Sequence, residues 1–320
     1  MKLIIQIPCK DEEENLPKVL AELPTSIPGI STIQTQVIDD GSTDRTYEVA
    51  RELGVDHIVR FRKNRGLGNA FKAWVENALR EWADIVVNTD ADNQYPSKYI
   101  TDLVQPIISG SADIVIGNRK PTEVEHFKRY KKKLQWLGNI VVGTLAGEMM
   151  PDAVSGFRAY SRESLLSLNV TAKFSYVIDT ILQAHKKGLQ IDRVNITTNL
   201  PTRPSRLFKN IRQHIKKSTA NIVRVYAMYE PLRTFLFMSV PFFVLWGIGI
   251  LRYVIARSVG NGSGKIQSLV LSAILITIAF NLFSLWVLGD IIAKNRALVE
   301  EHMRMTKKMK YGLTEWEKNI

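Results

Sequence analysis

The stretch IVVNTDADNQ, residues 85–94, indicates both the fold class and the chemistry of this chain. Its first half is a short apolar run typical of a buried strand, and two carboxylates at alternate positions follow directly. In sheets of parallel strands, ligands gather where the strands end. Mg²⁺ and Mn²⁺ prefer oxygen ligands and usually take one or two carboxylates plus substrate phosphates. We therefore predict a metal site at Asp90 and Asp92 with Gln94 as a third ligand, the alternative being a solvated acidic turn.

The same rhythm of strand, turn and helix extends on both sides of this stretch. The other β-type runs are Leu3–Pro8, Gln36–Ile38, His57–Phe61 and Ile114–Gly117. Apolar residues recur with helical spacing from Leu67 to Trp82, which predicts a helix packed on the core. This alternation predicts an α/β fold with a largely parallel sheet.

Polar groups also follow the first three strands. Acidic residues follow the first strand, where they also suit the first turn of a helix. After the second strand, Asp39 and Asp40 are good hydrogen-bond acceptors for ribose hydroxyls or a base. Asn64 and Gly66 lie in a glycine-rich helix start that could approach a diphosphate. The dinucleotide fingerprint and the P-loop pattern are both missing, which disfavours NAD binding and excludes a P-loop nucleotidase.

Two apolar stretches follow this part of the chain. No charged residue occurs from Phe235 to Leu251 or from Ile266 to Gly289. Each stretch, with its flanks, suits a hydrocarbon core of about 30 Å, which needs about 20 residues. A short polar link joins them, so they predict a transmembrane hairpin. A pair of buried helices in a soluble domain is the alternative.

Charge gives the expected orientation of this hairpin. The chain has 43 Lys and Arg against 31 Asp and Glu, a formal net charge of +12. Many of the basic residues lie beside the spans, in 203–233 and 294–310, whereas the link carries few. The positive-inside rule then places both termini in the cytoplasm. This clustering favours a membrane surface over nucleic acid as the polyanion, and residues 206–233 are expected to form amphipathic juxtamembrane helices.

Together these motifs resemble glycosyltransferase family 2 over roughly residues 3–205. The likeness rests on IPCKDEEEN, DDGSTD and DADNQ, and within the family it is nearest to polyprenyl-phosphate glycosyltransferases through IGNR and DAVSGFRAY. The resemblance implies a GT-A type, Rossmann-like mixed sheet with helices on both faces. It divides the chain into a catalytic domain at 1–205, juxtamembrane helices at 206–233, spans at 234–257 and 265–290, and a cytoplasmic tail at 291–320.

The resemblance also implies the activity. The expected enzyme moves one sugar, with inversion, from a nucleotide-diphospho-sugar to undecaprenyl or dolichyl phosphate at the cytoplasmic face of the cell membrane. Mg²⁺ or Mn²⁺ is the expected cofactor, and self-association through small residues in the spans is an open possibility. The residues implied to bind the donor and acceptor are Pro8, Asp11, Glu12, Asp39, Asp40, Asn64, Gly66, Asp90, Ala91, Arg129 and Arg203.

The chemistry restricts the role of each catalytic candidate. The resemblance implies that Asp152 lies near the reacting centre, and Asp92 is a further catalytic candidate. Because a phosphate monoester is already largely ionised at pH 7, Asp152 fits an orienting role better than that of a general base. Four arginines are candidates for offsetting the repulsion between two bound anions: Arg119, Arg129, Arg158 and Arg203. The basic stretch 120–133 is expected to be a loop that closes over the substrates.

Three other functions are weighed against this one. A transferase acting on another membrane acceptor, such as a diacylglycerol, would share every motif named above. A polysaccharide synthase would normally carry a Gln-x-x-Arg-Trp motif and more spans, neither of which occurs in this sequence. A non-catalytic membrane scaffold would explain the hairpin but not the three separate polar motifs.

Overall fold

The computed structural model describes residues 1–120, 129–147, 150, 152–170, 176–200, 219–220, 231–259 and 266–312. The chain forms two compact units. The sheet unit lies within Met1–Ile222 and Met303–Ile320, and the helical-pair unit lies within Val223–His302.

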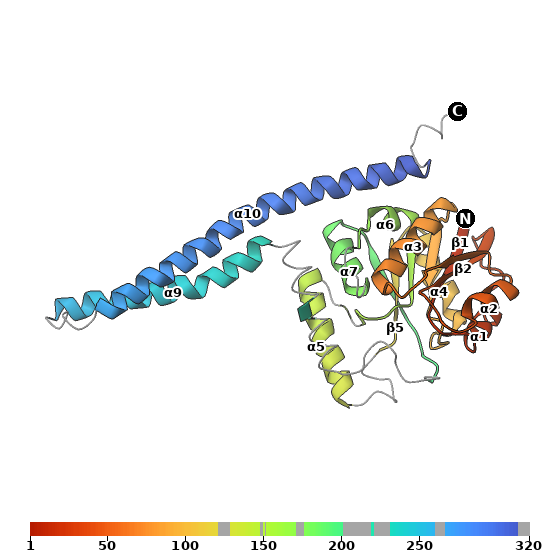
Figure 1. The fold of residues 1–320 in the computed structure, drawn as a ribbon, viewed down its shortest axis with the longest axis horizontal. Coiled ribbons are helices and arrows are strands. Elements are labelled where there is room, and N and C mark those ends of the chain that lie inside the picture. Colours follow the sequence, from red (N-terminus) through yellow and green to blue (C-terminus); the bar gives the residue numbers. More distant parts are fainter. Residues whose placement is uncertain are drawn as a thin grey trace. The chain divides into compact units, whose positions relative to one another are not determined.

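A seven-stranded sheet is the centre of the sheet unit (Figure 1). Its order is β3-β2-β1-β4-β6-β5-β7. The strands are β1 (Lys2–Cys9), β2 (Thr32–Asp39), β3 (His57–Arg60), β4 (Ile85–Asn88), β5 (Ile114–Asn118), β6 (Arg158–Ser161) and β7 (Ile191–Asn195). Only β6 runs antiparallel to its neighbours among the described strands, so the sheet is largely parallel and is the mixed sheet that the resemblance implies.

The register brings the polar strand ends to one edge. Cys9 pairs with Asp39 across β1 and β2, and Gln6 pairs with Asn88 across β1 and β4. Segments that leave β1, β2 and β4 therefore start side by side. On the other side of β4, Asn88 pairs with Arg158 of β6, which brings the segment before β6 to the same edge.

Helices cover both faces of the sheet (Figure 1). On one face, α1 (Leu16–Ala21), α2 (Thr46–Glu52) and α4 (Ile100–Ile108) pack against odd-numbered residues of β1. On the other face, α3 (Leu67–Arg80) places Phe71 and Trp74 in an aromatic cluster with Tyr160 of β6 and with Tyr176. The helix predicted from Leu67 is confirmed as α3.

The remaining elements of the sheet unit follow the order of the chain. They are η1 (Ser97–Tyr99), α5 (Arg129–Ala146), α6 (Arg162–Ser167) and α7 (Val177–Lys186). The expected loop over 120–133 is corrected in part, because α5 already begins at Arg129. Long side chains with good helix propensity, such as those of Lys131 to Lys133, support a helix as readily as a basic loop.

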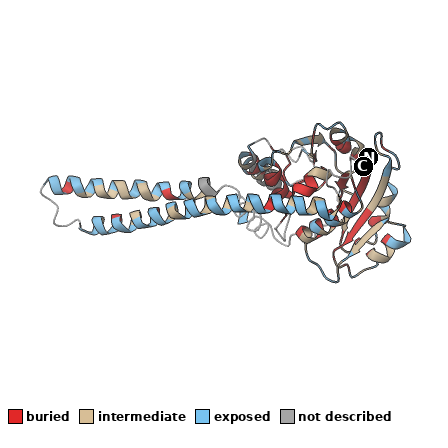
Figure 2. Ribbon diagram, turned by 90° about the horizontal axis from the view of Figure 1, so that it is seen from above, coloured by how far each residue is buried: buried red, intermediate tan, exposed pale blue. Residues whose placement is uncertain are grey.

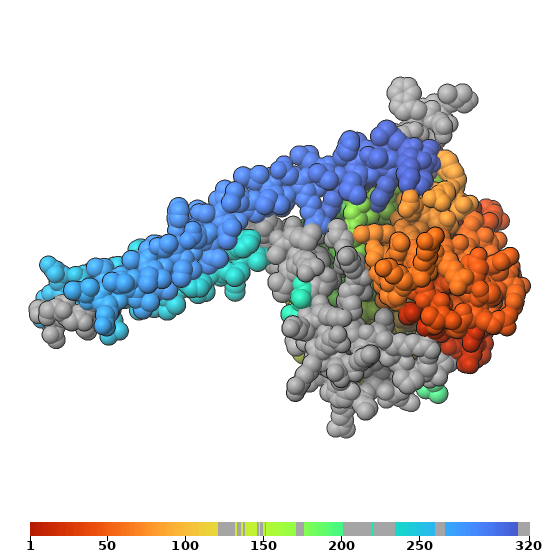
Figure 3. Space-filling model, in the orientation of Figure 1, coloured from red at the N-terminus to blue at the C-terminus, as the bar shows by residue number. Residues whose placement is uncertain are grey.

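The last turns of α10 (Ile266–Lys310) belong to the sheet unit and contact α3 and α6 (Figure 3). Arg304 forms an ion pair with Glu163, and Lys310 Nζ lies 2.7 Å from Glu76 Oε1. Lys307 Nζ donates to the carbonyl of Leu168 at 2.9 Å. A cation at the carbonyl end of α6 also complements the helix dipole.

The helical-pair unit contains α9 (Pro231–Ser258) and the greater part of α10. Thr234–Ser258 and Ile266–Lys310 are long and apolar enough to cross a membrane. Large apolar side chains such as Phe237, Leu251 and Phe280 are exposed, and both helices are mostly exposed in Figure 2. Such a surface is typical of a lipid-facing helix rather than of a soluble one. The helix does not end with its apolar stretch, since α10 continues to Lys310.

Candidate active site

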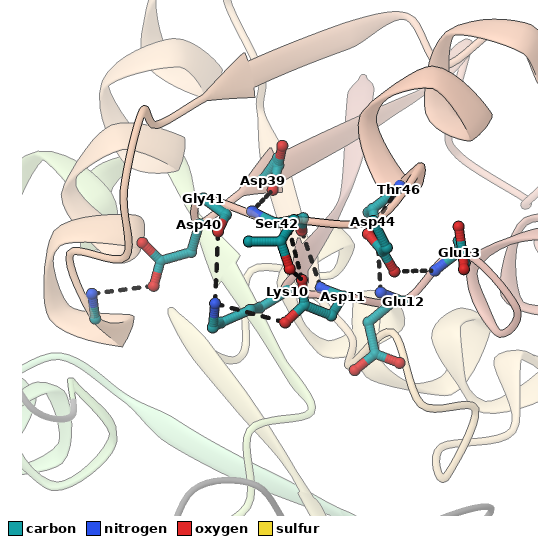
Figure 4. A network of polar contacts seen from close by, with 12 residues as sticks. Lys10, Asp11, Glu12, Glu13, Asp39, Asp40, Gly41, Ser42, Asp44 and Thr46 are labelled. Carbon is teal, nitrogen blue, oxygen red and sulfur yellow. Dashed lines mark hydrogen bonds and ion pairs between the residues drawn. The ribbon is translucent and has the colours of Figure 1, made fainter.

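The β1–β2 end of the sheet edge contains a network of carboxylates and backbone N–H groups, shown in Figure 4. Asp11 has a positive φ of 54°, and its Oδ1 accepts hydrogen bonds from Thr43 N at 2.8 Å and Thr43 Oγ1 at 3.2 Å. Ser42 Oγ accepts from Asp11 N, and Ser42 N donates to Asp39 Oδ1 at 2.7 Å. The N–H of Thr43 lowers the pKa of Asp11. The two strand ends are thus joined by hydrogen bonds to the carboxylates of Asp11 and Asp39.

Asp40 connects the β2 end to the start of α3. Its Oδ1 accepts from Arg65 N at 2.7 Å and its Oδ2 accepts from Gly66 N at 3.0 Å. Gly41 has a φ of 73°, and a Cβ there would lie 2.6 Å from Asn64 N. The loop that carries Asn64 and Gly66 therefore packs directly on this turn. Both carboxylate oxygens of Asp40 accept hydrogen bonds from that loop and so fix its backbone.

The other predicted donor-binding residues at this end have well-defined places. Asp39 is fully buried, with Oδ2 3.2 Å from Arg60 Nε. Glu12 is buried and accepts a hydrogen bond from Asn15 at 3.0 Å. Pro8, at the end of β1, is half-buried. The structure brings the residues predicted at this end together. Hydrogen bonds already connect the segments that carry them.

The carboxylates after β4 lie in a different environment. Burial and, to a smaller extent, the nearby charge of Asp92 raise the pKa of Asp90 to about 7, although Arg119 opposes the shift. Burial also raises the pKa of Asp92, although Gln94 donates to its Oδ2 at 2.8 Å. Ala91 is buried in the apolar cluster around β1, so only its backbone can face a ligand. This end of the site holds excess negative charge.

Arg119 and Asp152 form a buried, two-pronged ion pair. Arg119 Nε lies 2.6 Å from Asp152 Oδ2, and Arg119 Nη2 lies 2.8 Å from Asp152 Oδ1. The backbone N–H of Arg119 also donates to Asp152 at 3.2 Å. Asp152 is 2% exposed. A carboxylate held by three donors orients an arginine and is poorly suited to abstract a proton.

Gly156 lies where the segment before β6 meets β4. A Cβ at this position would lie 3.4 Å from Asp90 Oδ1 and 3.5 Å from Oδ2, so the backbone forms one wall of that carboxylate. Asn88 Nδ2 donates to the carbonyl of Gly156 at 2.8 Å. The antiparallel β6 thus places the SGF segment against the predicted metal ligand.

The expectation that Arg158 offsets the repulsion between two bound anions is corrected by its position. Its side chain is fully buried. The guanidinium donates to the carbonyls of Ser155, Ala153 and Val177 at 2.8, 3.0 and 2.9 Å, and to Thr180 Oγ1 at 2.9 Å. Arg158 therefore fixes the segment that follows Asp152 instead of reaching a ligand.

Two predicted cations lie outside what the structure describes. Arg203 is outside the described residues, as is most of the juxtamembrane segment 206–233. Arg129 begins α5, and its side chain is not among those described. Their expected contacts with phosphate remain predictions.

Tyr95 and Asn139 are site residues that sequence reasoning missed. Burial raises the pKa of Tyr95 to about 12, with Arg119, Asp90 and Asp152 as electrostatic neighbours. Asn139 Oδ1, from α5, accepts a hydrogen bond from Ala153 N at 3.1 Å. The position of Tyr95 directly after DADNQ was the available signal for this residue. Nothing in the local sequence marks Asn139.

The donor set after β4 fits a divalent cation. Two carboxylates with raised pKa values lie together, and Arg119, which opposes the shift of Asp90, is already paired with Asp152. A hard divalent cation would relieve this repulsion. No group of three or more His, Cys, Asp or Glu side chains suited to a metal occurs among the described residues. Further ligands would therefore come from Gln94, water and a substrate phosphate.

Comparison with known proteins gives a consistent assignment. The family model for glycosyl transferase family 2 matches residues 4–168. A dolichol-phosphate mannosyltransferase of Pyrococcus furiosus is 35% identical over 51% of this chain and 47% of its own length, so this chain spans about half of that relative. An undecaprenyl-phosphate mannosyltransferase of Micrococcus luteus is 26% identical over 62% of this chain and 83% of that protein.

A solved structure supports the fold. Glucosyl-3-phosphoglycerate synthase from Mycobacterium tuberculosis, crystallised with Mn²⁺ and uridine diphosphate, aligns with a TM-score of 0.52. The alignment covers 71% of this chain and 78% of that one, with 22% identity. At this identity the likeness establishes the GT-A-like arrangement of the sheet and no more.

Proposed function

This chain belongs to glycosyl transferase family 2, and from that premise we propose that it transfers one sugar from a nucleotide-diphospho-sugar to a polyprenyl phosphate. The chain is a glycosyltransferase, and its relatives include enzymes named for transfer to dolichol phosphate and undecaprenyl phosphate. The observation that carries the proposal is the position of the Asp90–Asp92 pair beside the Arg119–Asp152 pair at one sheet edge.

The two ends of that edge suit the two ends of the donor. The β1–β2 network, with Pro8, Glu12, Asp39 and Asp40, would meet the nucleoside. The β4 end would meet the diphosphate, with Asp90 and Asp92 holding Mg²⁺ or Mn²⁺. Gln94 would join them through its oxygen after a half-turn of the amide, since its nitrogen now faces Asp92. When bound, the metal would neutralise the leaving diphosphate.

The proposed reaction is a single displacement with inversion. An oxygen of the acceptor phosphate attacks the anomeric carbon, and the bond from that carbon to the diphosphate oxygen breaks. A phosphate monoester, with a second pKa near 6, is already largely ionised at pH 7, so no strong base is required. Asp152 keeps Arg119 oriented, and Arg119 would offset the repulsion between the two anions.

Membrane anchoring by α9 and the apolar part of α10 would bring the lipid acceptor to the enzyme. The basic residues that flank these helices support a cytoplasmic catalytic unit and cytoplasmic termini. A lipid acceptor is insoluble in water, so an anchored enzyme meets it by diffusion within the bilayer.

The test is transfer of radiolabelled sugar from a panel of UDP-, GDP- and dTDP-sugars to undecaprenyl phosphate. The full chain is assayed in detergent with Mg²⁺, with Mn²⁺ or with EDTA, and Asp92→Ala is the control. We expect metal-dependent labelling that Asp92→Ala abolishes. A product formed only with diacylglycerol would assign the other membrane acceptor instead. Absence of transfer to either lipid, with nucleotide bound to intact protein, would contradict the proposal.

A further inference from the structure

Tyr95 connects the metal-binding segment to the segment before β6. Its side chain is 5% exposed, and Gly156 N donates a long hydrogen bond of 3.4 Å to its hydroxyl oxygen. Its ring stacks on Phe157, with centroids 5.1 Å apart and planes 13° apart. The residue thus contacts two consecutive positions of SGFR through two kinds of interaction.

Tyr95 contacts Gly156, and the backbone of Gly156 lies against the Asp90 carboxylate. Tyr95 holds the N–H of Gly156, and Asn88 holds its carbonyl at 2.8 Å. A Cβ on Gly156 would lie 3.4 and 3.5 Å from the two Asp90 oxygens, which is an ordinary van der Waals contact distance. A shift of Gly156 would therefore change the space available to the Asp90 carboxylate.

The hydroxyl is also surrounded by the charged groups of the site. Arg119, Asp90 and Asp152 are its electrostatic neighbours. Within the described part of the chain, the hydrogen bond from Gly156 is the only one its hydroxyl makes. Its ring packing does not require a hydroxyl, because a phenylalanine would stack on Phe157 equally well. The hydroxyl therefore needs an explanation beyond core packing.

We propose that Tyr95 is a positioning residue, whose hydroxyl holds Gly156 against Asp90 and thereby sets the affinity of the site for a divalent cation with a nucleoside diphosphate. This inference rests on the proposed function, because it assigns Asp90 to the metal. Tyr95 acts through Gly156 and Asp90, and contact between its hydroxyl and the reacting atoms is not part of the inference.

The test is calorimetric titration of the full chain in detergent with Mn²⁺ and UDP, on wild type and Tyr95→Phe. We expect about tenfold weaker Mn²⁺-dependent UDP binding in Tyr95→Phe, the scale of losing one hydrogen bond and leaving a buried N–H unpaired. The melting temperature should change little, because the ring and its stacking remain. Tyr99→Phe is the matched control, since the Tyr99 hydroxyl bonds Thr197 away from Gly156.

A second variant tests the other hydrogen bond that holds Gly156. Asn88→Ala removes the hydrogen bond to the Gly156 carbonyl, and we expect it also to weaken Mn²⁺-dependent UDP binding. Because both hydrogen bonds act on one peptide segment, the double variant should lose less than the sum of the two single effects. The affinity for UDP in EDTA should be the same in all variants.

The outcomes separate this inference from the proposed function. If wild type binds UDP with no dependence on Mn²⁺, the proposed metal site fails. If wild type needs Mn²⁺ and Tyr95→Phe binds as tightly, the positioning role of Tyr95 is overturned. A loss of UDP affinity in EDTA as large as that in Mn²⁺ would also overturn it, and so would full additivity with Asn88→Ala.

Discussion

The carboxylates at the β1–β2 end of the site and those after β4 differ in what surrounds them. Asp11 and Asp40 accept hydrogen bonds from backbone N–H groups, so their charge is balanced by the protein itself. Burial raises the pKa of both Asp90 and Asp92, the charge of Asp92 also raises that of Asp90, and Arg119, the arginine that opposes the Asp90 shift, is paired with Asp152. The first end is shaped before any ligand binds. The second end favours a bound cation.

The largest effect should come from neutralising the β4 end. Asp92→Asn should reduce metal-dependent sugar transfer by about 10³-fold, because the diphosphate loses its countercharge in the transition state. The measurement is kcat/KM at saturating Mn²⁺. In the metal-free protein at pH 8, the variant should be at least as stable as wild type, since one of two repelling carboxylates is gone. A marked loss of metal-free stability would contradict the comparison.

Breaking the Arg119–Asp152 pair should damage folding as well as activity. Asp152→Ala leaves the Arg119 guanidinium buried without its main partner, which should destabilise the protein by about 3 to 5 kcal/mol. Urea unfolding of the detergent-solubilised chain gives this value. Combining Asp152→Ala with Arg119→Met should restore part of the stability but none of the transfer. Activity that recovers together with stability would show that neither residue takes part in the reaction.

At the β1–β2 end, removing a carboxylate should act through local structure. Asp40→Ala leaves the N–H groups of Arg65 and Gly66 without an acceptor and should cost about 2 kcal/mol of stability. It should also weaken UDP binding in EDTA, because the loop that carries Asn64 loses its support. Asn64→Ala, an exposed change in the same loop, should alter stability by less than about 0.5 kcal/mol. Equal effects of the two substitutions would contradict the structural role of Asp40 at this end.

The smallest effect concerns pH and Asp11. The Thr43 N–H lowers the pKa of Asp11 below its ordinary 3.8, so the folded state binds this proton less tightly than the unfolded chain. Its contribution to stability is therefore complete above about pH 3.8 and is lost as pH falls through the lowered value. Asp11→Asn should flatten that part of the stability profile, measured by urea unfolding between pH 5 and 2.5.

Several features of the fold could be predicted because they depend on short stretches of sequence. The runs at Leu3–Pro8 and Ile85–Asn88 mark strands, and the carboxylates directly after them had to lie at the sheet edge once the strands were parallel. The stripe from Leu67 marks α3 for the same reason, since helical spacing of apolar residues is a local signal.

Other features could not be predicted because they depend on distant contacts. β6 is short, and only pairing with β4 and β5 makes it a strand. That pairing turns Arg158 inward, where backbone carbonyls satisfy it, although an arginine in a loop motif suggests a ligand contact. Tyr95 acquires its place only because Gly156 and Phe157, about sixty residues later, lie against it.

Local patterns of residues are sufficient to place polar groups at the strand ends, to mark the stretches that are apolar enough to span a membrane, and to assign the family. Which of the strand-end groups already have hydrogen-bond or ion-pair partners depends on how the chain folds. Asp40 meets its N–H donors some 25 residues away, and Asp152 meets Arg119 across 33 residues. The charge balance of a carboxylate depends on neighbours brought together by folding, whereas its place at the end of a strand depends only on the residues just before it.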